Sequence, residues 1–93
     1  MINNELIKLN KKYLLVLQKE LTLMSKYNHL GPEKLKIMYN ILNCRRIIDN
    51  NNSTKYFELQ QRIITQLSRE NDNTAFDKQC ECLLKQIEIE LDF

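Results

Sequence analysis

This chain of 93 residues has one glycine and one proline, and the two are neighbours, Gly31-Pro32. Glycine permits the positive-φ conformations of tight turns, and proline interrupts helices. A chain with so little of either has few means of forming β-hairpins or long shaped loops. The scarcity argues against folds built on strands and predicts helices joined by short polar turns.

Other absences narrow the class of protein. Tryptophan is missing, and the cysteines number three, which argues against a secreted disulfide framework. No apolar run approaches the roughly 18 residues of a transmembrane helix, so we expect no membrane span. The first residues show no basic region followed by an apolar one, so we expect no secretory signal. Together these absences predict a cytoplasmic protein in a reducing compartment.

Leucine and isoleucine are abundant, with 15 and 10 residues, and 43% of the chain is hydrophobic. That fraction is too high for a disordered chain, and the length suits a single domain over residues 1–93. Apolar residues recur at spacings of three and four, which predicts amphipathic helices. We therefore expect an all-α, antiparallel bundle of three or four helices, at about 3–27, 32–48, 54–70 and 74–91.

Each predicted helix carries an apolar stripe that we expect to face the core. The stripes are, in order, Ile2, Leu6, Leu9, Tyr13, Val16, Leu23 and Tyr27; Leu35, Met38, Ile41, Leu42 and Ile48; Tyr56, Leu59, Ile63 and Leu67; and Phe76, Cys80, Leu83, Leu84, Ile87 and Leu91. Pro32 suits the first turn of the second helix. The polar run 49–54 offers N-cap oxygens, and Thr74 with Asp77 resembles a weak capping box.

The first helix has more apolar residues than one core-facing stripe needs. Leu14, Leu15, Val16 and Leu17 are consecutive, although each step along a helix turns about 100°. Either this helix is the central, most enclosed one, or part of its apolar surface is left for a partner. On the second interpretation, the expected partner contacts are Leu14, Leu15, Leu21, Ile89 and Phe93, and a symmetric homodimer is one way to cover them.

Charge is unevenly distributed along the chain. Residues 1–46 hold nine basic and three acidic side chains, whereas residues 47–93 hold five basic and nine acidic ones. Three carboxylates, Glu88, Glu90 and Asp92, crowd the end of the fourth helix, where the helix dipole disfavours anions. Antiparallel packing predicts that they lie beside Lys8, Lys11 and Lys12 of the first helix. The alternative is that they meet a basic partner.

Residues that could support catalysis are few. His29 is the only histidine, and Cys80 and Cys82 project about 200° apart on a helix, so they cannot share a tetrahedral metal ion. One glycine cannot form a phosphate-binding loop. We expect no enzyme activity, cofactor or metal site. Cys44 and Cys80 are expected in the core, and Cys82 outside it.

The stretch Tyr39–Asp49, an apolar helix with two arginines that leads into a polar turn, is similar to one in the small helical chaperones of flagellar and type III export. The resemblance implies an all-helical cytosolic protein that holds a secretion substrate against an apolar groove. It assigns no site residues here.

The sequence thus predicts a non-catalytic protein-binding module, of the adaptor, chaperone or inhibitor kind, that acts by helix packing. The alternative is a small nucleic-acid-binding regulator that uses the basic N-terminal half. We consider nucleic acid the less favoured partner, because lysines dominate that half and the acidic half repels phosphate.

Overall fold

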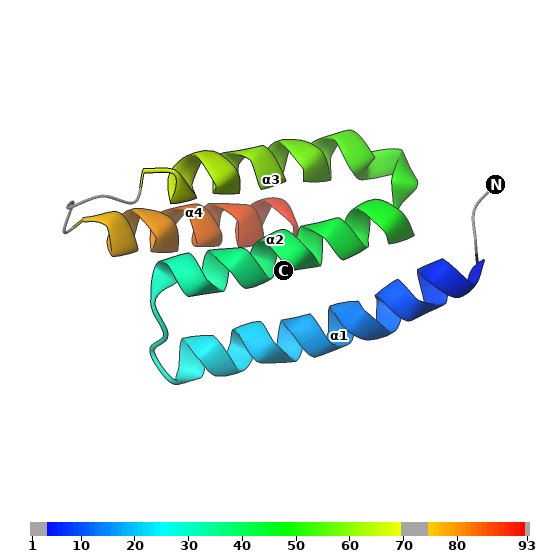
Figure 1. Ribbon diagram of the computed structural model, residues 1–93, viewed down its shortest axis with the longest axis horizontal. Helices are drawn as coiled ribbons and strands as arrows, with labels where there is room; N and C mark the ends of the chain where they lie inside the picture. Colours follow the sequence, from blue (N-terminus) through cyan, green and yellow to red (C-terminus); the bar gives the residue numbers. More distant parts are fainter. Residues whose placement is uncertain (1–3, 70–74, 93) are drawn as a thin grey trace.

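The computed structural model describes residues 4–69 and 75–92. They form four α-helices packed against one another (Figure 1). The helices are α1 (Asn4–Lys26), α2 (Gly31–Ile48), α3 (Ser53–Leu67) and α4 (Phe76–Glu90), and a short 3-10 helix, η1 (Asn50–Asn52), precedes α3. Neither described range contains a strand. The predicted all-α bundle is confirmed. The predicted helix ends at residues 27, 32, 48, 54 and 91 lie within one residue of the observed ones, and those at residues 3, 70 and 74 lie outside the described residues.

The central helix is α2, because α1, α3 and α4 all pack against it. Among the described helices, α1 packs closely against α2 alone. The interpretation of the first helix as the central, most enclosed one is therefore wrong. A physical reason is the five lysines distributed around α1, which would lose their hydration in a central position. The second helix carries its charges at its two ends and is free of them from residue 37 to residue 44.

The core forms where the stripes of α2, α3 and α4 meet. The buried members of these predicted stripes are Leu35, Met38, Ile41, Leu42, Tyr56, Leu59, Ile63, Phe76, Cys80, Leu84, Ile87 and Leu91. Ile48, Leu67 and Leu83 pack partly buried at its margin. In α1, only Leu17 and Leu21 are buried.

Gly31 begins α2 at a point where this helix closely approaches α4. Its backbone N–H donates a hydrogen bond to the side-chain carboxylate of Asp77. A Cβ atom on Gly31 would lie 2.7 Å from the backbone oxygen of Asp77 and 2.9 Å from the Cβ of Cys80. Gly31 does not have a positive φ; in the preceding turn that conformation belongs to Asn28, at 57°. Glycine is thus required here for close helix packing, not for a turn.

Two buried polar groups connect α2 to its neighbours. The side chain of Gln60 is fully buried; its amide nitrogen donates to the backbone oxygen of Tyr39 at 3.1 Å, and its oxygen accepts from Arg46 at 3.0 Å. The ammonium group of Lys34 pairs with the carboxylate of Glu81 on α4. Buried polar groups need such partners, because an unsatisfied one costs about 1–3 kcal/mol. These contacts therefore define how α3 and α4 sit on α2.

The acidic end of α4 is neutralised by α3 rather than by α1. We predicted that three lysines of the first helix would lie beside it: Lys8, Lys11 and Lys12. That prediction is wrong, because α1 does not pack against α4. Instead, the carboxylate of Glu90 accepts from Arg62 at 3.0 Å, and its backbone oxygen accepts from Lys55 at 3.1 Å. Glu88 is partly buried, and desolvation raises its pKa.

The predicted side-chain caps do not occur as expected. Thr74, the first residue of the predicted capping box, lies outside the described residues. The carboxylate of Asp77, its second residue, accepts a hydrogen bond from the backbone N–H of Gly31 in α2. The helix α3 begins without a side-chain cap hydrogen bond. In the turn before it, the Asp49 carboxylate accepts from the Asn52 amide at 2.8 Å and from the Tyr56 hydroxyl at 3.1 Å. These hydrogen bonds favour the ionised carboxylate and lower the pKa of Asp49.

Replacing Gly31 by alanine tests the close approach of α2 and α4. The new Cβ must displace backbone of α4, so we expect Gly31→Ala to lower the free energy of unfolding by about 1–3 kcal/mol. Asn40→Ala is the matched control, because Asn40 is an exposed α2 residue where alanine favours the helix. Urea denaturation followed by circular dichroism measures both. Equal stabilities of the two variants would contradict the close packing.

The three thiols differ in accessibility as the stripes predict: Cys44 and Cys80 are buried, and Cys82 is exposed. Burial also raises the pKa of Cys44, which reduces its reactive thiolate fraction. We expect a thiol reagent to modify Cys82 first. The two buried cysteines should react more slowly by a factor of roughly ten or more. Mass spectrometry of the labelled protein over time measures the rates. Uniform labelling of all three would show that the α2 and α4 faces are misassigned.

Candidate protein-interaction surface

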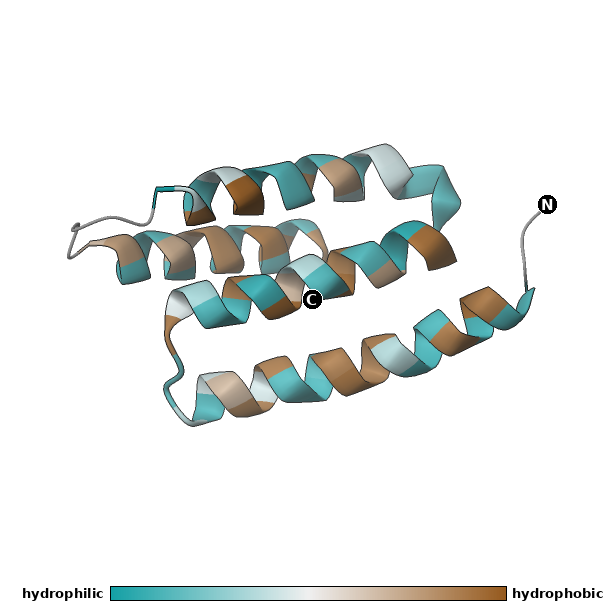
Figure 2. Ribbon diagram, viewed as in Figure 1, coloured by the Kyte–Doolittle hydropathy of each residue, from teal (hydrophilic) through white to brown (hydrophobic). Residues whose placement is uncertain are grey.

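The helix α1 carries two apolar stripes, and the structure buries one of them. The stripe that faces α2 has five apolar residues and one asparagine, again at spacings of three and four; Leu17 and Leu21 are buried, and Ile7, Asn10, Leu14 and Met24 are partly buried. The other stripe, which we predicted from its periodicity to face the core, faces solvent instead. Figure 2 shows hydrophobic residues along the whole length of α1. The first helix is therefore apolar on two sides, of which the fold uses one.

We call the exposed set the α1 stripe: Leu6, Leu9, Tyr13, Val16, Leu23 and Tyr27. These residues are between 45% and 66% exposed. Our prediction that they face the core is wrong. Ile2, predicted with them, lies outside the described residues. Glu20, also exposed, occupies the one position of the repeat that is not apolar.

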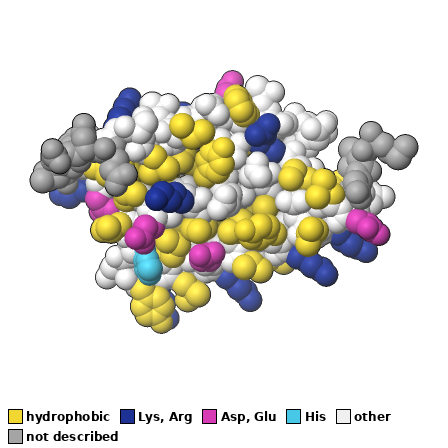
Figure 3. All heavy atoms as spheres, in the orientation of Figure 1, with side chains coloured by type: hydrophobic (Ala, Val, Ile, Leu, Met, Phe, Trp, Pro, Cys, Tyr) yellow, Lys and Arg dark blue, Asp and Glu magenta, His cyan; other side chains and the backbone are white. Residues whose placement is uncertain are grey.

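The α1 stripe runs beside the contact with α2. Since each helical residue turns about 100°, the stripe is centred about a third of a turn from the side of α1 that faces α2. Figure 3 shows hydrophobic side chains gathered over α1 and along its border with α2. Six half-exposed side chains of this size present roughly 500–600 Å² of surface, at the upper end of what ordinary monomers expose in one patch.

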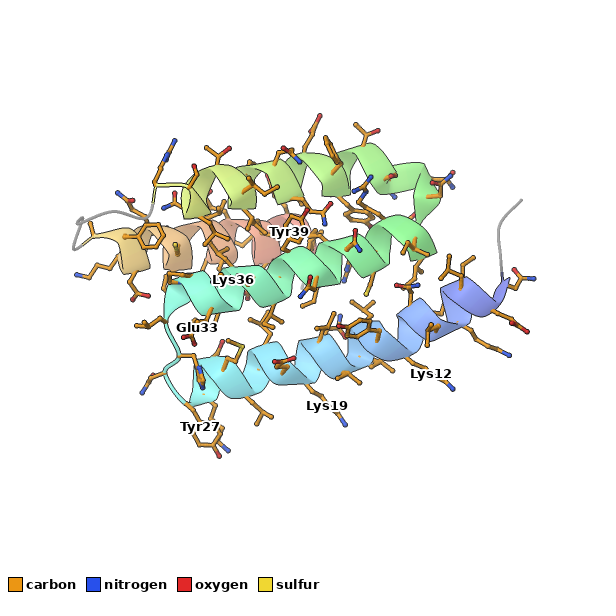
Figure 4. All side chains as sticks on the ribbon, viewed as in Figure 1. Lys12, Lys19, Tyr27, Glu33, Lys36 and Tyr39 are labelled. Carbon is orange, nitrogen blue, oxygen red and sulfur yellow. The ribbon has the colours of Figure 1, made fainter. Side chains whose placement is uncertain are left out.

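A row of lysines follows the other edge of the stripe. Lys12, Lys19 and Lys26 recur every seven residues and are exposed. Figure 4 shows Lys12 and Lys19 projecting from α1 on the side away from α2. The ammonium group of Lys26 lies 5.7 Å from the centre of the Tyr27 ring, a cation–π contact. We call these three residues the lysine row.

The five residues that we predicted as partner contacts differ in burial and in the helix that carries them. Leu15 is 63% exposed and, with Lys19 and Leu23, lines a shallow hollow on the outer side of α1. Leu14 packs partly buried against the core, and Leu21 is buried in it, so neither offers an open surface. Ile89 is 79% exposed, but it lies on α4. Phe93 lies outside the described residues.

Leu15 and Ile89 do not form one surface, because α1 does not pack against α4. Leu21 was predicted as a partner contact. It belongs instead to the stripe that covers α2. Sequence reasoning missed the α1 stripe as a candidate surface because it assigned those residues to the core. The glutamate within the repeat was the available signal, since a charged residue rarely occupies a core position.

A hollow of about 620 Å³ lies between α3 and α4. Among the described residues, its lining includes Arg62, Lys78 and Cys82 but no histidine or carboxylate, and Arg62 already binds Glu90. Elsewhere, His29 lies 3.0 Å from Glu33 at an exposed turn. Within residues 4–69 and 75–92, no group of three or more metal-binding side chains occurs. The α1 stripe is therefore the most distinctive surface.

No helix in the described ranges combines the length and apolar character needed to cross a membrane. Comparisons with models of protein families, with curated proteins and with solved structures found no match to this chain. The resemblance of Tyr39–Asp49 to the export chaperones gains no support from them.

Two neighbouring α1 residues test which stripe faces solvent. Leu17 is 2% exposed and Val16 is 59% exposed. We expect Leu17→Ala to lower the free energy of unfolding by about 2–5 kcal/mol, because it leaves a cavity beneath α1. Val16→Ala should change it by no more than about 0.5 kcal/mol. Chemical denaturation of both variants decides the matter, and the reverse order of costs would place the α1 stripe in the core.

Proposed function

We propose that this chain is a non-catalytic protein-binding module, of the small adaptor, chaperone or inhibitor kind. It packs the α1 stripe against a helix of a partner protein. The observation that carries the proposal is the stripe itself, with five large hydrophobic side chains on one exposed face of α1 and Tyr27 in the turn that follows it. The chain has three cysteines, an odd number that argues against a secreted disulfide framework and favours a reducing, cytoplasmic setting.

The spacing of the stripe supports helix packing as the mode of binding. Residues at alternating steps of four and three form the seam that one helix presents to another. Such a seam buried against a helix, together with its flanking residues, approaches the roughly 800 Å² that each partner contributes to a standard interface. A single helix laid along α1 would also cover the border with α2.

Nucleic-acid binding by the basic half is the alternative, and the structure gives it less support. Several cations of this half have roles within the fold: Lys34 pairs with Glu81, and Arg46 donates to Gln60 and lies 5.0 Å from the Phe57 ring. A phosphate backbone would also leave the apolar stripe uncovered. Salt distinguishes the two, because phosphate binding weakens steeply as salt rises.

Capture of partners from the native cell tests the proposal. The tagged chain is compared with a double variant of the stripe, Val16→Asp with Leu23→Asp. We expect the captured protein to fall roughly tenfold or more, because each carboxylate would be desolvated in an apolar interface. Mass spectrometry quantifies the captured proteins, and circular dichroism confirms that the variant is folded.

The matched control is Ile64→Asp with Ile89→Asp, which makes the same chemical change at exposed residues of α3 and α4. This control should capture the partner like the original chain. Loss in the control alone would move the interface to those helices. Capture that is unaffected by the stripe variant, or that consists of nucleic acid released by moderate salt, would overturn the proposal.

A further inference from the structure

We propose that the helix bound by the α1 stripe is acidic. It places apolar residues on the stripe and aspartate or glutamate residues beside the lysine row. This inference rests on the proposed function and specifies the chemistry of the partner. It is carried by the juxtaposition of two features on α1, the apolar seam and the cationic edge that follows it.

The lysine row is available to a partner. Lys12 and Lys19 project into solvent on the side of α1 away from α2. None of the three has an ion pair with a described carboxylate: the described pairs join His29, Lys34 and Arg62 to their acids. Their spacing of seven residues matches the edge of a second helix lying along the seam, where acidic residues at the same spacing would meet them in turn.

The wider charge distribution acts in the same direction. Residues 1–46 carry a net charge of +6, from nine basic and three acidic side chains. Neither α3 nor α4 packs against α1, and the carboxylates of Glu81 and Glu90 are engaged with α2 and α3. The field around α1 therefore favours the approach of an anionic segment, and charge complementarity of this kind raises the association rate and rejects like-charged partners.

A second copy of this chain is a poorer occupant. Two α1 helices packed antiparallel through their stripes bring the two lysine rows side by side, because equivalent edges meet in that arrangement. Packed parallel and in register, they bring the two Glu20 side chains together within the seam. Like charges oppose both arrangements. The homodimer predicted from surplus apolar residues is thus disfavoured by the charged residues that accompany the stripe.

Three synthetic helical peptides of about three heptads test the proposal against the full chain. The first has leucine at the seam positions and glutamate on both flanks. The second has the same seam with lysine flanks, and the third has glutamate flanks and serine in the seam. Fluorescence anisotropy measures binding at low and moderate salt. We expect the first peptide to bind roughly tenfold or more tightly than the second, and the third not to bind.

Charge reversal identifies the residues responsible. The triple variant Lys12→Glu, Lys19→Glu and Lys26→Glu should invert the preference, so that the lysine-flanked peptide binds more tightly. The matched control, Lys11→Glu, Lys78→Glu and Lys85→Glu, makes the same change in net charge at exposed positions outside the row. It should keep the preference for the acidic peptide. Raising the salt should weaken the preference in both cases.

The outcomes separate this inference from the proposed function. Equal binding of the acidic and basic peptides, both lost in the stripe variant, would overturn the acidic partner while the helix-binding function stands. A dimer in sedimentation equilibrium that Val16→Asp dissociates would replace the acidic partner by a second copy. No binding of any peptide, with partner capture indifferent to the stripe variant, would overturn both.

Discussion

The packing of this molecule depends on α2, the one helix that all the others touch. Its N-terminus approaches α4 so closely that only glycine fits at residue 31, and the Asp77 carboxylate accepts the N–H that begins the helix. Further along, Lys34 and Arg46 connect it to α4 and α3 through Glu81 and Gln60. With α2 held in this way, α3 and α4 pack on it together, and α1 packs on its remaining side, where Leu17 and Leu21 join the core.

Much of this arrangement could be predicted from the sequence. The spacing of leucine and isoleucine correctly predicted four helices and, in α2, α3 and α4, the residues that form the core. Those helices each carry one dominant apolar stripe, so the pattern had a single solution. The side-chain caps were less predictable, because Asp49 and Asp77 could hydrogen-bond within their own turn or across the fold. Spacing alone does not distinguish these outcomes.

For α1, the sequence contains two stripes of the same period, one residue out of register with each other. Leu14, Leu17 and Leu21 compete with Leu9, Tyr13 and Val16, and periodicity cannot rank them. Glu20 does rank them, because burying its ionised carboxylate in a core would cost far more free energy than leaving the tyrosine side chains in water. The candidate surface could thus have been found from one charged residue. The absence of contact between α1 and α4 could not have been predicted from the sequence, since it depends on how the helices are arranged in space.

The attachment of α1 through a single side has a consequence for the dynamics of the chain. A helix that packs against α2 alone can open without separating α2, α3 and α4 from one another, although its opening exposes the part of the core that Leu17 and Leu21 cover. Local opening of α1 therefore costs less free energy than global unfolding, and its amide hydrogens should exchange sooner than those of α2. A ligand bound along its outer side would slow that exchange by mass action. The helix that packs against one neighbour alone would then report, through its own protection, whether its exposed side is occupied.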